Sequence, residues 1–290
     1  MKTKKLLNLF GGAIALGTFG VLLYLENRRP LRRRVESKLT RSSRNLTIAG
    51  LAAIALQLAE QPIAAPLTKL VERKNIGLLK LVRLPGSLEA ILAVLLMDYT
   101  LYVWHVLTHR IAFLWRFHLV HHIDLDLDAS TALRFHFGEI IVSALWRAAQ
   151  IVVIGVSPVS FAAWQMFLFP SILFHHSNVR LPIDWEEKIS RFVVTPRLHG
   201  IHHSTEREET DSNWSSGLTV WDWLHGTLKT DVPQNEIIIG VPAYQEPIEV
   251  GLTKIVPLPF GKQKSAWEFQ PASNFNEIQT NKFELDNSHS

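Results

Sequence analysis

Long apolar runs separated by polar segments dominate the chain up to about residue 174. The runs cover residues 6–25, 46–59, 88–107, 140–156 and 159–174. The first and third match the length of about 20 residues that a helix needs to cross a bilayer. The last two are shorter and are separated by Ser157-Pro158, which predicts a hairpin that enters and leaves the membrane on one side. The pattern therefore predicts an all-α, multi-pass integral-membrane helical bundle.

A strongly basic segment follows the first apolar run. Residues 27–45 carry eight Lys or Arg side chains, where a signal peptide would have a small-residue cleavage site. We therefore expect residues 6–25 to be a retained membrane helix. Positive charge concentrates on the cytoplasmic side of membrane proteins, so the segment predicts a cytoplasmic loop. It contains no interleaved aromatic residues, and we expect no nucleic-acid partner.

The residues able to hold a metal are histidines, since the chain has no cysteine for a thiolate site. Eleven of the thirteen histidines lie between residues 105 and 203, in one HxxxH and two HxxHH clusters. Residues three or four apart share one face of a helix, so each cluster directs its imidazoles toward one point. The clusters comprise His105 and His109, then His118, His121 and His122, then His199, His202 and His203. Eight imidazoles exceed the four ligands of one tetrahedral site and predict two metal ions.

The order of runs and clusters places the histidines together. The first cluster ends the run 88–107, the second follows directly, and the predicted hairpin returns before the third. All three therefore fall on one side of the bundle, and the basic segment makes that side cytoplasmic. The expected fold is an integral-membrane bundle with a cytosolic histidine-rich cap that holds a di-metal site.

Carboxylates near the clusters are candidates for orienting the ligands. Asp98 precedes His105 by two helical turns, with Tyr102 between them on the same face. A metal-ligating histidine usually donates its second N–H to a carboxylate or carbonyl, so Asp98 either accepts that bond or packs as a polar residue between helices. Glu139 is a second candidate for such a role. Three aspartates at positions 124, 126 and 128 either pair with basic residues or solvate a loop, and we favour the loop.

The ligand type alone leaves the metal open, because imidazole suits Fe, Zn, Cu and Ni. A hydrolase with two zinc ions would normally include bridging carboxylates, whereas these clusters are almost purely histidine. A transporter would place its ligands in mid-membrane along a path, whereas these lie at the ends of apolar runs. A redox metal that acts on C–H bonds of a lipid-like substrate is the favoured interpretation. A zinc-dependent membrane hydrolase and a non-catalytic metal transporter are the alternatives.

The ordered motifs resemble the fatty acid hydroxylase/sterol desaturase superfamily of membrane di-iron oxygenases from about residue 88 to 230. They are Asp98-x3-Tyr102-x2-His105-x3-His109, Phe117-His118-x2-His121-His122, Arg134-Phe135-His136-x2-Glu139, His176-Ser177-Asn178, Thr195-Pro196-Arg197-x-His199-x2-His202-His203-Ser204 and Trp221-Asp222-x2-His225-Gly226-Thr227. Phe137 departs from the Pro common at that place in the family, and many members have Phe where His225 stands.

The resemblance implies what such a protein would bind and do. It implies two Fe ions, with Zn as an alternative occupant in purified protein, and O2 as co-substrate for hydroxylation or desaturation of a lipid or sterol-like substrate. An external electron donor, a ferredoxin or a cytochrome or reductase, would be needed. The family's ligands correspond to the eight clustered histidines, with His136 and His176 as further ligands and His175 as a rival to His176. The expected domains are 1–87 with membrane helices and basic loop, 88–230 with the catalytic site, and 231–290 as a partly disordered extension.

Overall fold

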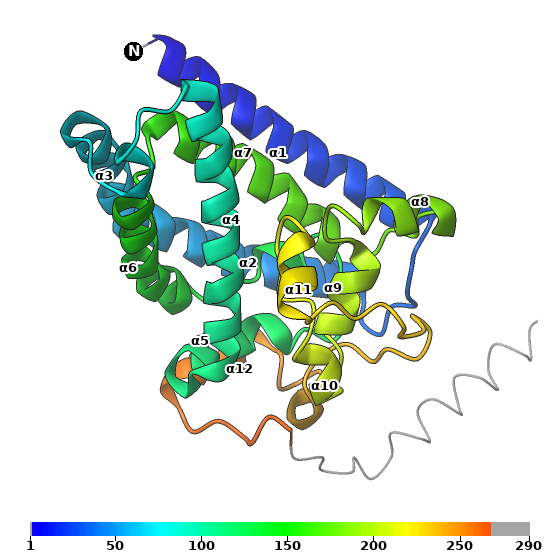
Figure 1. Ribbon diagram of the computed structural model, residues 1–290. Coiled ribbons are helices and arrows are strands. Elements are labelled where there is room, and N and C mark those ends of the chain that lie inside the picture. Colours follow the sequence, from blue (N-terminus) through cyan, green and yellow to red (C-terminus); the bar gives the residue numbers. More distant parts are fainter. Residues whose placement is uncertain (1, 268–290) are drawn as a thin grey trace, which may run out of the picture.

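The computed structural model describes residues 2–267, and side chains from residue 11 onward. The expectation of an all-α fold is confirmed: this part of the chain contains helices joined by turns and no strand beyond isolated bridges. Seven longer helices build the bundle (Figure 1). They are α1 (Lys2–Arg28), α2 (Lys38–Ala55), α3 (Gln61–Lys74), α4 (Gly86–Arg110), α5 (Ala112–His122), α6 (Phe137–Ile154) and α7 (Pro158–His176).

Three helical segments within the described residues are long and apolar enough to cross a membrane. They are Lys38–Lys80, Gly86–Arg110 and Phe137–Ile154. This confirms the membrane protein that the apolar runs predict. The runs 6–25 and 159–174 form the long helices α1 and α7, and the number of crossings stays a prediction.

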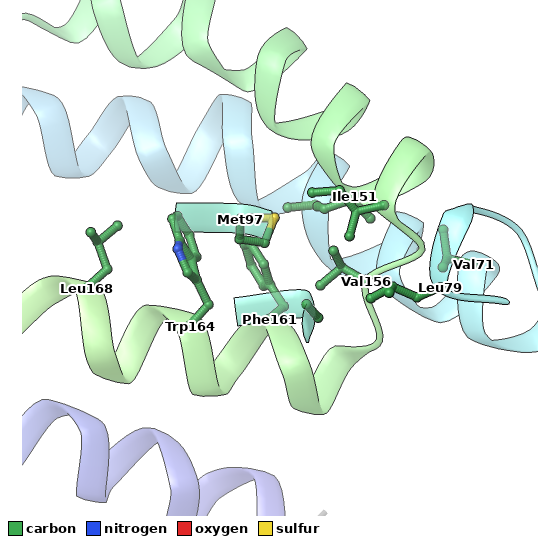
Figure 2. Packing of buried hydrophobic residues seen from close by; sticks show 11 residues of the cluster. Val71, Leu79, Met97, Ile151, Val156, Phe161, Trp164 and Leu168 are labelled. Carbon is green, nitrogen blue, oxygen red and sulfur yellow. The ribbon is translucent and has the colours of Figure 1, made fainter. Parts of the chain in front are cut away.

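The core of the bundle forms where α3, α4, α6 and α7 meet. Met97 of α4 lies between Phe161 and Trp164 of α7 and Ile151 of α6, and all four side chains are buried (Figure 2). Close packing of this kind supplies many small dispersion contacts, which drive helix association where lipid is as apolar as the protein. The core therefore fixes the position of α4, the helix that carries the first histidine cluster.

The alternating aspartates after the second cluster are buried, so their expected role as a solvated loop is wrong. Arg41 contacts Asp128 at 2.5 Å and Arg44 contacts Asp124 at 3.1 Å, while Asp126 accepts the backbone N–H of residues 35 and 36. Burial would raise the pKa of Asp124, but the neighbouring guanidinium of Arg41, with others beside it, lowers it to about 2. Part of the basic segment thus forms buried ion pairs that link the start of α2 to the residues at the end of α5.

The segment after residue 240 packs onto α5. Val241, Tyr244, Val250 and Ile255 form one buried cluster with apolar residues of α5, and short helical turns such as α12 (Leu252–Ile255) carry them. The extension 231–290 is expected to be partly disordered, and its residues 268–290 lie outside the described part of the chain. The division into three domains stays a prediction.

Candidate metal centre

Two groups of four histidines converge inside the cap. The first comprises His105 and His109 of α4, His122 of α5 and His202 of α9 (Pro196–His202). The second comprises His121 of α5, His176 of α7, His199 of α9 and His203 just after it. Within each group, one ring nitrogen from every residue lies within 4.8 Å of the others. The rings of His122 and His203 stack with centroids 4.3 Å apart, so the two groups are neighbours.

The two HxxHH clusters divide their histidines between the groups. Neighbouring residues His121 and His122 go to different groups, and so do His202 and His203. The expectation that each HxxHH cluster directs all of its rings to one point is therefore wrong, whereas the HxxxH cluster does direct His105 and His109 to one group. Consecutive residues are about 100° apart around a helix, whereas residues four apart are nearly in line. Hence His199 and His203 share one group, as do His105 and His109, while the adjacent residue in each HH pair faces the other group.

The tautomers of His105 and His202 show that the first group fits a cation. Nδ1 of His105 lies 2.7 Å from the carbonyl oxygen of Trp214, and Nδ1 of His202 lies 2.8 Å from that of Ser212. A carbonyl can only accept, so each Nδ1 carries the proton and each neutral ring presents a bare Nε2. These two Nε2 atoms face each other at 3.1 Å. Two lone pairs at this distance repel unless a positive charge lies between them.

The second group has the spacing of ligands around one ion. Nε2 of His176 lies 3.0 Å from Nε2 of both His121 and His199, and Nε2 of His199 lies 3.2 Å from Nε2 of His203. Nitrogens bound at ~2.0–2.1 Å to one ion are about 3.3 Å apart in a tetrahedron and about 3 Å apart between neighbouring octahedral positions. The residues of both groups therefore fit a bound metal pair.

Burial keeps the imidazoles outside the membrane helices in the form that binds metal. Desolvation lowers the pKa of His121, His122, His199 and His203 well below 6.5, and that of His202 to about 3. Neutral histidine is the ligand form, so these side chains need release no proton before coordination. Several ring nitrogens in the centre are buried without a hydrogen-bond partner in the protein, including Nε2 of His109 and both nitrogens of His122.

Three further histidines were candidates, and the structure places them differently. His118 lies beside the first group, 4.9 Å from both His109 and His122 by ring centroid, and its Nδ1 contacts Glu139 Oε1 at 2.8 Å. Glu139 therefore holds the carboxylate position that the sequence indicated. His136 is not brought to the groups: its Nδ1 accepts the N–H of residue 138 and its Nε2 contacts the carbonyl of residue 256. His175 packs against His199 but stands outside both groups, which favours His176 as the ligand.

Asp98 and Tyr102 do not support the ligands in the expected way. Oδ2 of Asp98 accepts the N–H of Leu218 at 3.0 Å and the indole N–H of Trp221 at 2.7 Å. The Tyr102 hydroxyl meets Thr227 Oγ1 at 3.2 Å. The expectation that Asp98 binds the second nitrogen of His105 is wrong, because a backbone carbonyl occupies that place. Both residues instead attach the segment around residues 218–227 to α4.

Nothing in the sequence indicates which atoms orient His105 and His202 of the first group. The carbonyls of Ser212 and Trp214 belong to the backbone, which has no residue-type signature. The carboxylate of Asp222 in α11 (Val220–His225) accepts the N–H of Trp214 at 2.8 Å and of Ser215 at 3.0 Å. Asp222 lies in the Trp221-Asp222 motif, so its presence was visible although its role was not.

Fold and centre together define a helical membrane protein with a buried polyhistidine site. Residues 90–227 match the fatty acid hydroxylase family model. The ornithine lipid hydroxylase OlsE of Rhizobium tropici is 29% identical over 54% of this chain and 46% of its own length. Human alkylglycerol monooxygenase is 27% identical over 50% of this chain and 31% of its own length, and mouse cholesterol 25-hydroxylase is 25% identical over 49% and 47%. No solved structure matches the chain significantly.

The chain thus matches less than half the length of these three relatives. The names of these relatives describe hydroxylases and monooxygenases acting on lipids or a sterol. The metal, the dependence on O2 and the electron donor are expectations taken from the ligand chemistry and the family resemblance.

Proposed function

We propose that the chain is an O2-dependent di-iron oxidoreductase that hydroxylates a C–H bond of a lipid or sterol-like substrate in the membrane. The reaction consumes one O2, two electrons and two protons, and it yields one alcohol and one water. The two electrons come from an external donor, a ferredoxin or a cytochrome or reductase. A bound iron pair supplies the redox chemistry that no side chain of the protein can perform on an unactivated C–H bond.

The observation that carries the proposal is the pairing of two four-histidine groups in one buried centre. Every ligand atom in the two groups is an imidazole nitrogen. Zinc hydrolases with two ions normally include bridging carboxylates, whereas neither group here contains one and the carboxylate of Glu139 is bound to His118. Imidazoles also carry no charge, so a divalent pair would keep a strong attraction for anionic oxygen ligands. This ligand set favours redox chemistry over hydrolysis.

The protein's own residues hold the ligands in place and keep water out. The carbonyls of Ser212 and Trp214 set the orientation of His202 and His105, as described above. The Trp214 ring packs against His109 with centroids 4.6 Å apart, and the Trp115 ring packs against the same histidine at 4.9 Å. A site enclosed in this way limits the entry of water, which protects a reactive oxidant from side reactions.

Several finer expectations belong to the same proposal. The histidine cap faces the cytoplasm, where soluble reductants are available, because the exposed cations after α1 lie on the side of the cap. The eight histidines of the two groups are the metal ligands, and His118 is a further ligand held by Glu139. Asp98 and Tyr102 act by attaching the 218–227 segment to α4 rather than by contact with the metals.

The decisive test combines lipid analysis with isotopic oxygen. The full chain is expressed in a host that lacks it, and the host lipids are compared by mass spectrometry after growth under 18O2. We expect a lipid alcohol that carries one 18O atom and is absent with His202→Ala. An unlabelled alkene would show desaturation instead. Two zinc ions per chain with no O2 consumption would contradict the oxidase and favour a hydrolase.

A further inference from the structure

Large apolar side chains are exposed on α8 (Ile183–Ile189), on the turn after it and on α11. Trp223 is 72% exposed, Phe192 70% and Trp185 67%. We call this surface the α8–α11 face, and it comprises Ile183, Trp185, Phe192, Val220, Trp223 and Leu224. Single exposed apolar residues are ordinary, but a patch that includes two Trp and one Phe marks an interaction surface.

Backbone contacts make the turn and the start of α11 one continuous surface. The N–H of Thr219 donates to the carbonyl of Phe192 at 3.1 Å, and the N–H of Val194 donates to the carbonyl of Gly217 at 3.1 Å. The turn that follows α8 therefore lies beside the residues that lead into α11. The exposed side chains of the turn and of the start of α11 therefore project from backbone segments that are hydrogen-bonded to each other.

The position of α11 along α4 decides what surrounds this face. The indole of Trp221 binds Asp98, which is the midpoint of the membrane helix α4. At 1.5 Å per residue this point is about 18 Å from either end of the helix. In contrast, Asp211, just after α10 (Arg207–Thr210), pairs with Arg110 at 3.1 Å, the last residue of α4. Along the axis of α4, α11 therefore lies closer than α10 to the middle of this membrane helix.

Aromatic stacking attaches α11 along the same stretch of α4. The ring of His225 stacks on Tyr102 at 5.0 Å and on Tyr99 at 5.8 Å, and Trp221 packs on Tyr99 at 5.1 Å. These contacts occupy the inner side of α11, so Trp223, whose side chain is exposed, lies on its outer side. An apolar side chain facing outward at this depth meets lipid rather than water.

Cations flank the face where α8 approaches the end of α1 (Figure 1). The N–H of Arg180 donates to the carbonyl of Arg29 at 2.7 Å, which ties the segment before α8 to the end of α1. Lys188 and Arg191 are exposed on and after α8. The Arg28 guanidinium lies 5.6 Å from the ring of Tyr24. Aromatic residues bordered by Lys and Arg are the pattern of a membrane interface rich in anionic headgroups.

We propose that the α8–α11 face is embedded in the cap-side leaflet of the bilayer, with its apolar side chains among the acyl chains and the neighbouring cations at the headgroups. Asp98 and His105 are seven residues apart on α4, a distance of about 10 Å along the helix. A lipid resting against α11 therefore lies within reach of the first histidine group. The embedding depends on the membrane helices alone, so it can hold even if the proposed hydroxylation does not.

Because the chain has no cysteine, a single introduced cysteine can carry a probe that reports the depth of the α8–α11 face in the bilayer. Three single-cysteine variants, Trp185→Cys, Phe192→Cys and Trp223→Cys, are labelled with a nitroxide and reconstituted as the full chain into vesicles containing anionic lipid. Collision with O2, which concentrates in the bilayer, is compared with collision with a water-soluble nickel chelate. Leu145→Cys on the exposed side of α6 provides the lipid reference, and Glu208→Cys on α10 provides the water reference.

We expect the three labels to collide with O2 more than with the nickel chelate, as the Leu145→Cys label does, because the face lies among the acyl chains. Labels that follow Glu208 would overturn the proposal. So would labels shielded from both reagents, because a second copy or another protein would then cover the face. A second measurement needs no label: lipids brominated in the upper acyl chain should quench a smaller share of tryptophan fluorescence in Trp223→Phe than in the unmodified chain.

Discussion

Asp222 offers a direct test of how the first histidine group is oriented. Its carboxylate accepts the N–H of Trp214 at 2.8 Å, the N–H of Ser215 at 3.0 Å and the hydroxyl of Thr227 at 2.8 Å. The same short segment presents the two carbonyls that receive Nδ1–H of His105 and His202. Replacing Asp222 by Ala removes the anchor of this segment without touching a proposed ligand.

The size of the effect follows from the bonds that are lost. Hydrogen bonds to a charged group contribute about 1.5–3 kcal/mol each. Only the part of this free energy that affects the orientation of the imidazoles changes metal binding. Loss of an outer hydrogen-bond partner of a metal ligand typically weakens metal affinity ~10–100-fold. This corresponds to about 1.4–2.8 kcal/mol. Asp222→Asn keeps the shape and part of the hydrogen bonding, so we expect a smaller loss than with Asp222→Ala.

The assay is metal content during graded competition with a chelator, on protein purified in detergent with iron loaded beforehand. Asp222→Ala should release about one metal of the pair at roughly 10–100-fold lower chelator than the unmodified chain does, and the second metal should follow the unmodified curve. Asp231→Ala removes an exposed carboxylate and is the matched control. Equal weakening of both metals, or an unchanged curve with correctly folded Asp222→Ala, would refute the orienting role.

Three further outcomes follow from the buried contacts of the centre and its supports. Glu139→Ala should lower activity or metal affinity ~10–100-fold because His118 loses its partner, whereas Glu139→Gln, which keeps an acceptor, should retain most of it; equal losses would contradict this. Arg41→Ala should destabilise by about 3–5 kcal/mol in thermal unfolding, because buried aspartates lose their counter-charge, while the exposed Arg33→Ala should change little. Metal-free protein should lose stability as pH falls below about 6.5, because the unfolded chain then binds protons that buried residues such as His202, with a pKa of about 3, do not bind in the folded chain. A melting temperature that does not change between pH 7.5 and 5.5 would contradict buried neutral imidazoles.

The apolar runs predicted the membrane class because a run of about 20 apolar residues has few other uses. They could not predict how polar segments fold back on one another. The aspartates at 124, 126 and 128 look like a solvated loop because alternation with Leu has no helical period. Their partners Arg41 and Arg44 lie about 80 residues earlier, and only tertiary structure brings such distant charges together. Burial without pairing would have been too costly, so pairing was the one alternative compatible with an interior position.

The histidines were recognisable because metal ligands must be specific side chains at helical spacing. The atoms that orient them are different, since a backbone carbonyl can come from any residue. For this reason Trp214 and Ser212 had no signature, while Glu139, a side-chain partner, did. Of the two alternatives for Asp98, the one that paired it with a metal-ligating histidine is wrong, because the helical spacing gave its face but not which element packs against that face. In the structure the 218–227 segment occupies that position.

The adjacent histidines in each HxxHH cluster explain why the pattern recurs. When residues i and i+4 of a short helix bind one ion, a ligand for a second ion must lie on another face of the helix. The residue next to i+4 is about 100° away around the helix and meets this requirement. In α9, His199 and His203 serve one group while His202 serves the other. In α5, His121 and His122 are divided in the same way. The separation between the two groups is therefore set within single helical turns, so their backbone positions are fixed relative to one another even where a single ring reorients. Two four-histidine sites on separate elements could change their distance from one another, whereas two sites built from the same helical turns keep a fixed distance. A fixed distance is the condition for a pair of metals to act on one oxygen molecule.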